Sequence, residues 1–268
     1  MIKAFFTNWA GAFRDSWGAA RALPILLVLM IGIEAAQHVV ELQLGFFSAD
    51  AAVRKAASLQ PLRMAFGWPK MLILYAVGFV ATRWFVMRDA RAALRPSGMA
   101  LRRYLWVVSF QLIPAVGTIY AGPIVAWLGR GPEAVATLRA VCGLGQLLLE
   151  PLLLLWFVNA AIGTHGYGPI ASARTVRWRY PWALLLIFVT RMPVSLLHNG
   201  FNHWAAGRPL ALQGMMLALD ALVVGVLALI VPAIQVRIAR YIADRRAVAL
   251  LDDTAPAAER RVAAWEAA

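Results

Sequence analysis

Charged residues are scarce in this sequence, and apolar residues are in large excess. Charged side chains make up 15% of the 268 residues and hydrophobic ones 62%, whereas soluble domains have about 25% and about 45–50%. This composition excludes an intrinsically disordered chain, because disorder requires low hydrophobicity and high charge. It also fits a soluble globular domain poorly. We therefore predict an integral membrane protein.

Acidic residues and lysine are both few. The chain has 13 acidic and 26 basic residues, a formal net charge of +13, and only three of the basic residues are lysine. In a soluble domain this excess would suggest binding to nucleic acid. Here the arginines cluster at the ends of apolar stretches, where basic residues set membrane orientation and contact anionic headgroups. We therefore expect membrane lipids at the cytoplasmic face, and no nucleic acid, as partners of these side chains.

Cysteine is nearly absent, and the familiar catalytic motifs are missing. The single thiol, Cys142, can form neither an internal disulfide nor a cysteine-based zinc site. The sequence has no H-E-x-x-H, G-x-S-x-G or Walker motif. His198 and Asn202 resemble the H-x-x-x-N element of CAAX-type intramembrane proteases, but the paired glutamates of those enzymes are missing. His198 and His203 are five residues apart and do not share a helix face, so we expect no metal, cofactor or catalytic residue.

Six apolar stretches are long enough to cross a bilayer, which takes about 20 residues. They are too long for strands and show no alternation of polar and apolar residues. The predicted fold class is all-α, a polytopic six-helix membrane bundle that forms one domain over residues 1–268. The spans are expected at Leu23–Leu42, Trp68–Met87, Tyr104–Leu128, Leu138–Ile162, Pro181–Gly200 and Leu210–Val236.

Basic residues are divided unequally between the two sides of these spans. Seventeen lie in the N-terminal segment, the second and fourth connections and the C-terminal tail, and six lie in the other connections. Basic connections stay in the cytoplasm. Both termini are therefore predicted to be cytoplasmic, in a multi-pass protein of a bacterial inner membrane.

The two flanks of the bundle are expected to be helical without crossing the membrane. Residues 1–22 carry four aromatic residues at a spacing of four. This stripe favours an amphipathic helix lying in the membrane surface over one docked on protein. Residues 237–268 are expected to form a cytoplasmic helical tail that ends, after Pro256, in a short amphipathic piece.

Ionisable residues occur deep inside four of the predicted spans. With a rise of about 1.5 Å per residue, Glu34, Glu150, Arg191 and Asp220 all lie near the midplane of an apolar core about 30 Å thick. A charge at this depth costs about 2.5–3.5 kcal/mol, so each needs a partner or water. We expect Arg191 to pair with Glu34 or Asp220. Arg83, near the end of its span, is expected to extend its side chain to the membrane surface.

Polar residues continue along one helix face from two of these positions. Glu34 is followed by polar side chains at i+4 and i+7, and so is Arg191. One interpretation is a buried ion-pair network that fixes helix packing; the alternative is a periplasm-open cavity that binds a solute or conducts protons. Prolines expected to kink the spans are Pro114, Pro123, Pro151, Pro193 and Pro232. The candidate cluster comprises Glu34, His38, Glu41, Glu150, Arg191, Ser195, His198 and Asp220.

Two segments resemble a family of bacterial six-span membrane domains. DARAALRPSGMALRRYLWVV, from Asp89, leads into the third span, and VLALIVPAIQVRIARYIAD, from Val226, ends the sixth. The family domain occurs fused to glycerophosphodiester phosphodiesterases and in YciC-like proteins. The resemblance implies envelope upkeep or partner anchoring. It carries over no catalytic residue, and the sequence has no phosphodiesterase domain.

Three functional hypotheses follow, in order of preference. The first is a non-enzymatic inner-membrane protein that maintains the envelope, or anchors or scaffolds partners, with another protein or a second copy as its partner. The second is a transporter or channel for a small solute or protons that uses the midplane Glu, Arg and Asp residues. The third is an intramembrane enzyme.

Overall fold

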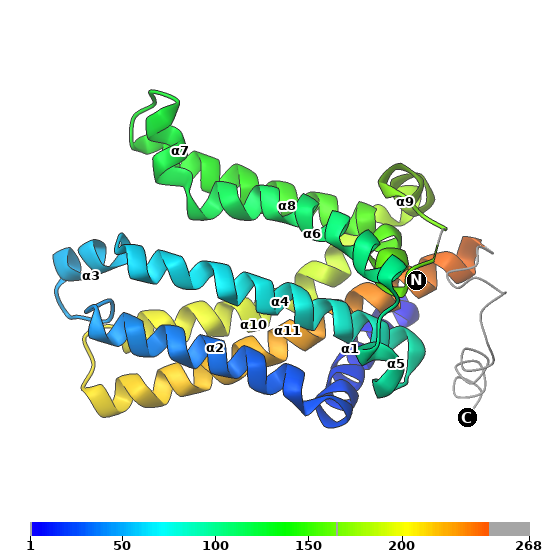
Figure 1. Cartoon of the computed structure of the whole chain (residues 1–268), viewed down its shortest axis with the longest axis horizontal. Helices are drawn as coiled ribbons and strands as arrows, with labels where there is room; N and C mark the ends of the chain where they lie inside the picture. The colour runs from blue at the N-terminus through cyan, green and yellow to red at the C-terminus, as the bar shows by residue number, and fades with distance from the viewer. Residues whose placement is uncertain (1, 165, 247–268) are drawn as a thin grey trace. The chain divides into compact units, whose positions relative to one another are not determined.

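The computed structural model describes residues 2–164 and 166–246, which are mostly helical (Figure 1). The predicted all-α fold is thereby confirmed. The predicted tail beyond residue 246, with its amphipathic piece after Pro256, lies outside the described residues. Within them the elements are α1 (Ile2–Ala22), α2 (Pro24–Gln43), α3 (Ala51–Ser58), α4 (Pro61–Met87), α5 (Ala90–Leu94), α6 (Gly98–Ile119), α7 (Ala121–Trp127), α8 (Glu133–Ile162), α9 (Pro169–Val176), the 3-10 helix η1 (Arg177–Arg179), α10 (Tyr180–Ala205) and α11 (Leu210–Arg246).

Five helical segments of the described chain are long and apolar enough to cross a membrane. They are α2, α4, α8, α11 and the run Pro169–Ala205, which contains α10. The bent pair of α6 and α7 makes a sixth if it counts as one span. This is the architecture of a helical membrane bundle.

The pair of α6 and α7, which corresponds to the predicted span Tyr104–Leu128, is sharply bent. α6 ends at Ile119, and α7 leaves it at an angle of 79°. Pro123 accounts for the break, because a proline ring collides with the carbonyl four residues earlier in a continuous helix, here that of Ile119. The expected kink at this proline is thus a change of direction rather than a gentle bend.

The second spanning helix begins earlier than predicted. α4 starts at Pro61 instead of Trp68 and contains Pro69 in its interior. Proline is well suited to the first turn of a helix, where its missing N–H has no partner to lose. As a result, Arg63 and Lys70 lie on a spanning helix and not in the connection where their charges were expected.

The described chain separates into two compact units. Unit 1 is the chain up to Ala81 together with Phe188–Ile234, and unit 2 is Thr82–Ile187 together with the chain from Gln235 onward. α4, α10 and α11 each contribute one part to each unit. The predicted cluster residues are therefore divided between units, with Glu150 in unit 2.

Unit 1 brings α2 and α11 very close together. A Cβ atom on Gly225 of α11 would lie 2.8 Å from Ile31 Cγ1 and 2.9 Å from Leu27 Cδ1 of α2. At one end of the unit, Gln213 Nε2 donates a hydrogen bond of 3.0 Å to the carbonyl of Phe47. A small apolar cluster lies at the same end and contains Phe47, Ala205 and Leu217.

Unit 2 contains an arginine whose environment differs from the expected one. Arg83 is 4% exposed and donates hydrogen bonds of 2.8–3.1 Å to the carbonyls of Ala92, Ala93 and Ala161. Carbonyls near the ends of helices have no partner within the helix and carry partial negative charge. The expectation that Arg83 extends to the membrane surface is therefore wrong, because the ends of α5 and α8 supply its acceptors inside the protein.

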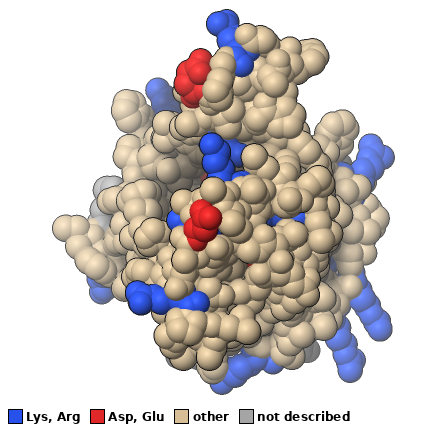
Figure 2. Space-filling model, turned by 90° about the vertical axis from the view of Figure 1, so that its left-hand side faces the viewer, with Lys and Arg blue, Asp and Glu red and all other residues tan. Residues whose placement is uncertain are grey.

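Large apolar side chains are exposed on both units. Val28 of unit 1 is 61% exposed, and Trp106 and Trp127 of unit 2 are 69% and 84% exposed. Most of the surface visible in Figure 2 is neither basic nor acidic, and basic side chains are more widespread on it than acidic ones. Extended exposed apolar surface marks contact with a membrane or a partner, which agrees with the spanning helices.

Candidate functional site

Four helices of unit 1 enclose a group of polar side chains that we call the buried polar cluster. Each helix contributes at least one ionisable residue, and the members are linked by hydrogen bonds and ion pairs. They are Glu34, His38 and Glu41 on α2, Arg63 and Lys70 on α4, His198 and Asn202 on α10, and Asp220 on α11.

Asp220 is the centre of this cluster. Its side chain is fully buried. Oδ2 lies 2.9 Å from His38 Nε2 and accepts a hydrogen bond of 2.7 Å from Asn202 Nδ2, while Oδ1 lies 2.7 Å from His198 Nδ1. A buried carboxylate is tolerated only when its oxygens are hydrogen-bonded, and Asp220 meets this requirement with groups from two other helices.

His38 is placed between two carboxyl groups. Its Nε2 faces Asp220, and its Nδ1 lies 3.0 Å from Glu41 Oε2. Glu34 Oε1 is 3.6 Å from the same Nε2. Ionised carboxylates only accept hydrogen bonds, and a neutral imidazole has one N–H. Both contacts are hydrogen bonds at the same time only if the imidazole carries two N–H groups or one of the two carboxyl groups is protonated.

Two ion pairs connect α2 to α4 in an antiparallel arrangement. Arg63 Nε lies 2.8 Å from Glu41 Oε1, and Lys70 Nζ lies 2.5 Å from Glu34 Oε2. The residues of each helix are seven apart, which is two helical turns and about 10 Å along the axis. The basic side chains are 27% and 26% exposed, the acidic ones 2% and 1%. The pairs therefore run from the surface of unit 1 into its interior.

The charges of the buried polar cluster nearly cancel. Its three ionised carboxylates carry −3, and Arg63 and Lys70 carry +2. A buried ionic group is stable only when its charges are compensated, so Arg63 and Lys70 stabilise the carboxylates and one negative charge is left to be balanced.

The structure brings together five of the eight residues that the sequence predicted for the cluster. These are Glu34, His38, Glu41, His198 and Asp220. Arg191 and Ser195 lie on α10, and the pairing of Arg191 with Glu34 or Asp220 stays a prediction. Glu150 belongs to unit 2, where its Oε1 accepts a hydrogen bond of 2.7 Å from Gln235 Nε2.

Sequence reasoning missed the two basic members of the cluster. Arg63 and Lys70 were assigned to a connection, because the apolar run of α4 begins only after them. One signal was available, since the seven-residue spacing of these basic residues equals that of Glu34 and Glu41. Equal spacing on two helices is what a double ion pair between them requires.

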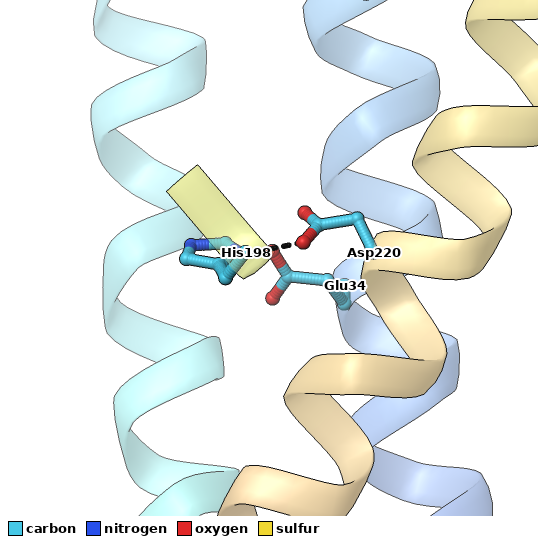
Figure 3. A group of neighbouring side chains, drawn as sticks. All are labelled: Glu34, His198 and Asp220. Carbon is cyan, nitrogen blue, oxygen red and sulfur yellow. Dashed lines mark hydrogen bonds and ion pairs between the residues drawn. The ribbon is translucent and has the colours of Figure 1, made fainter. Parts of the chain in front are cut away.

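Three members of the cluster are arranged so that they can hold a metal ion. Glu34, His198 and Asp220 each offer one ligand atom, and these atoms all lie within 4.8 Å of one another. Figure 3 shows the three side chains pointing toward one another from separate helices. The three residues were predicted to belong to one cluster, but no metal was expected there, because they do not form a metal-binding motif along the chain.

Unit 2 has a cavity of its own, of about 610 Å³, between α6, α8 and the chain that follows α8. Trp106, Phe110 and Trp156 form aromatic walls, and Arg103 and Thr164 add polar groups. Its volume is in the range of small-molecule sites. None of the residues predicted for the candidate cluster lines this cavity.

Comparison with known proteins adds no relative of this chain. No protein-family model, curated protein or solved structure matches it. The resemblance to the six-span membrane-domain family therefore stays a prediction that rests on the two segments quoted above. Function has to be argued from the chemistry of the site itself.

Proposed function

We propose that this integral membrane protein is a proton-linked transporter, in which the buried polar cluster of unit 1 binds a proton and exchanges it for a second cation. The observation that carries the proposal is Asp220, a fully buried carboxylate on a spanning helix that contacts His38, His198 and Asn202. An ionisable residue within a membrane span is a candidate functional site, because it is costly to retain without a role.

Energetics favours a functional over a purely structural cluster. Buried ion pairs are no better for stability than apolar residues of the same volume, and are often worse. Unit 1 nevertheless places three carboxyl groups that are at most 2% exposed inside its spanning helices. Packing alone would be served as well by leucine at these positions, so the cluster points to a task that needs charge.

The proton on His38 links helix contacts to charge. With the proton present, the imidazole holds Glu41 of α2 and Asp220 of α11 through its two nitrogens. Without it, one of the two contacts loses its hydrogen. His38 and Glu41 lie on the same helix, so the contact with Asp220 is the one that joins α2 to α11. Its loss would favour separation of α2 from α11, the kind of two-state element that alternating access requires.

A pH-jump measurement on proteoliposomes adsorbed to a solid-supported membrane tests this function. The wild-type protein should give a charge displacement as protons reach the cluster. His38→Gln and Asp220→Asn should abolish this displacement, because each removes a side chain that is proposed to bind the proton. Glu133→Gln, an acid on α8 outside the cluster, should leave it unchanged. The absence of any displacement in the wild type would reject the transporter and return the scaffold as the better hypothesis.

Orientation and membrane contacts form part of the same proposal. Both termini lie in the cytoplasm of a bacterial cell, and α1 lies along the inner face of the inner membrane. This is supported by the arginine distribution and by α1, in which Phe13 and Trp17 are 40% and 64% exposed while Ala12 and Ala19 are buried. Small residues on the packed face and aromatic ones on the free face suit a helix between protein and lipid headgroups.

A further inference from the structure

The group of Glu34, His198 and Asp220 has the spacing of a metal site. Around one ion with bonds of about 2.0–2.2 Å, ligand atoms lie roughly 3–4 Å apart. The three ligand atoms are within 4.8 Å of one another, so a shift of less than about one ångström per side chain would close them on an ion. Because they come from α2, α10 and α11, such an ion would hold three helices together.

A fourth ligand is within reach. His38 Nε2 lies 2.9 Å from Asp220 Oδ2 and 3.6 Å from Glu34 Oε1. Its other nitrogen, Nδ1, lies 3.0 Å from Glu41 Oε2. Histidine ligands usually donate their second N–H to a carboxylate, which orients the ring and increases its basicity. Glu41 is in a position to accept this hydrogen bond from His38.

The donor set selects the class of cation. Two imidazoles and two carboxylates suit divalent first-row transition metals such as Zn²⁺, Mn²⁺ and Fe²⁺. Mg²⁺ and Ca²⁺ prefer six or more oxygen ligands. The cluster has no thiolate that would select Cu⁺.

Charge balance gives the exchange that accompanies binding. Glu34, Glu41 and Asp220 supply three carboxylates, of which Lys70 contacts the first and Arg63 the second. A divalent cation together with Arg63 supplies three positive charges, which balance the three carboxylates. The ammonium group of Lys70 is then not needed as a counter-ion.

Lys70 is well placed to leave. Its Nζ contacts Glu34 Oε2, and its side chain is 26% exposed. A long flexible side chain can move its head to the surface while its methylene groups remain on apolar residues. Arg63, by contrast, also stacks on Phe46, with the guanidinium carbon 4.1 Å from the ring centre, so it remains with Glu41.

We infer that unit 1 contains a site for one divalent transition-metal cation, with Glu34, His38, His198 and Asp220 as ligands. Lys70 acts as a tethered counter-ion of Glu34, and binding of the cation displaces its ammonium group. That this cation is the second cation of the transporter rests on the proposed function, whereas binding itself does not.

Zn²⁺ binding to the full-length, metal-stripped protein in detergent tests the inference. Calorimetry with metal analysis should give one Zn²⁺ per chain, and no comparable binding of Mg²⁺. The absence of Zn²⁺ binding, or Mg²⁺ bound as tightly as Zn²⁺, would overturn the site or its donor set.

Variants with opposite expected effects separate site loss from misfolding. Asp220→Asn should weaken Zn²⁺ binding by more than about 100-fold, since even outer-shell losses weaken it by about 10–100-fold. Lys70→Met should tighten it about fivefold, because the competing cation is gone. His203→Gln, on α10 outside the cluster, is the matched control and should change nothing. Unchanged binding in Asp220→Asn, or weaker binding in Lys70→Met, would contradict the site.

The two proposals can fail separately. A charge displacement in the pH jump without Zn²⁺ binding would keep the proton-linked transporter and reject the metal site. One Zn²⁺ bound per chain without charge displacement would keep the metal site and reject proton-linked transport.

Discussion

His38 and Arg83 meet the same difficulty with different partners, because each brings a potential charge into an apolar helix. His38 is surrounded by carboxyl groups, so its proton can be exchanged within the cluster. Arg83 faces backbone carbonyls at the ends of α5 and α8, which cannot accept its proton. The first arrangement is suited to chemistry and the second to fixing structure.

The role of Arg83 predicts a specific loss of stability. Arg83→Lys keeps the charge but cannot supply the planar fork that reaches three carbonyls. Acceptors left without a donor cost about 1–3 kcal/mol each when buried, so thermal unfolding in detergent should show a loss of about 2–3 kcal/mol. Arg91→Lys, on the exposed face of α5, is the control. Equal melting temperatures for the two variants would contradict the structural role.

The sequence predicts those cluster residues that can be identified from their depth within a single span. Glu34 and Asp220 follow from their distance to the span ends, and His38 and Glu41 from sharing a face with Glu34. Their partners depend on which helices are neighbours and in what register. That information is not contained in any single helix, which is why Lys70 and Arg63 were missed and the partner of Glu34 was sought on α10.

At the scale of the helix, two glycines on α11 allow packing and propensity to be separated. Gly225 lies against α2, where a Cβ atom would be less than 3 Å from Ile31 and Leu27, whereas Gly214 has no atom within 4 Å of the same position. Alanine is favoured over glycine in a helix by about 1 kcal/mol. Alanine at either site should therefore gain the same helix propensity, but only at position 225 would its Cβ atom collide with neighbouring side chains.

Gly214→Ala should stabilise the protein by up to about 1 kcal/mol. Gly225→Ala should destabilise it by about 1–3 kcal/mol, as overpacking does, because the Ile31 and Leu27 side chains of α2 have to shift. Thermal unfolding of the two variants checks both points. If Gly225→Ala were as stable as Gly214→Ala, the close approach would be refuted.

Elements were predicted where length and apolar content decide them. The spanning helices follow from apolar runs of about 20 residues, and the kink at Pro123 from the chemistry of its ring. The short helices α5 and α9 do not follow from length and apolar content. They are 5 and 8 residues long, and helices of this length are stabilised by caps and tertiary contacts and not by their own sequence.

At the scale of the whole molecule, orientation is the property that the charge distribution predicts. In a Cys142→Ala background, Gln60→Cys and Met99→Cys introduce exposed thiols on opposite sides of α4. An impermeant thiol reagent added to whole cells should label position 60 and leave position 99 unlabelled, because the side with fewer arginines faces outward. Labelling at position 99 alone would show that the predicted orientation is wrong.

The double ion pair between α2 and α4 has a consequence for biogenesis. α2 carries two glutamates and no lysine or arginine, and the part of α4 in unit 1 carries Arg63 and Lys70 and no acid. Entering the bilayer alone, each helix would carry uncompensated charges that cost about 2.5–3.5 kcal/mol apiece near its centre. If the two helices enter as a hairpin, the ion pairs Glu41–Arg63 and Glu34–Lys70, two helical turns apart, neutralise these charges. We therefore expect α2 and α4 to pass from the translocon into lipid as a pair, after α4 has been synthesised.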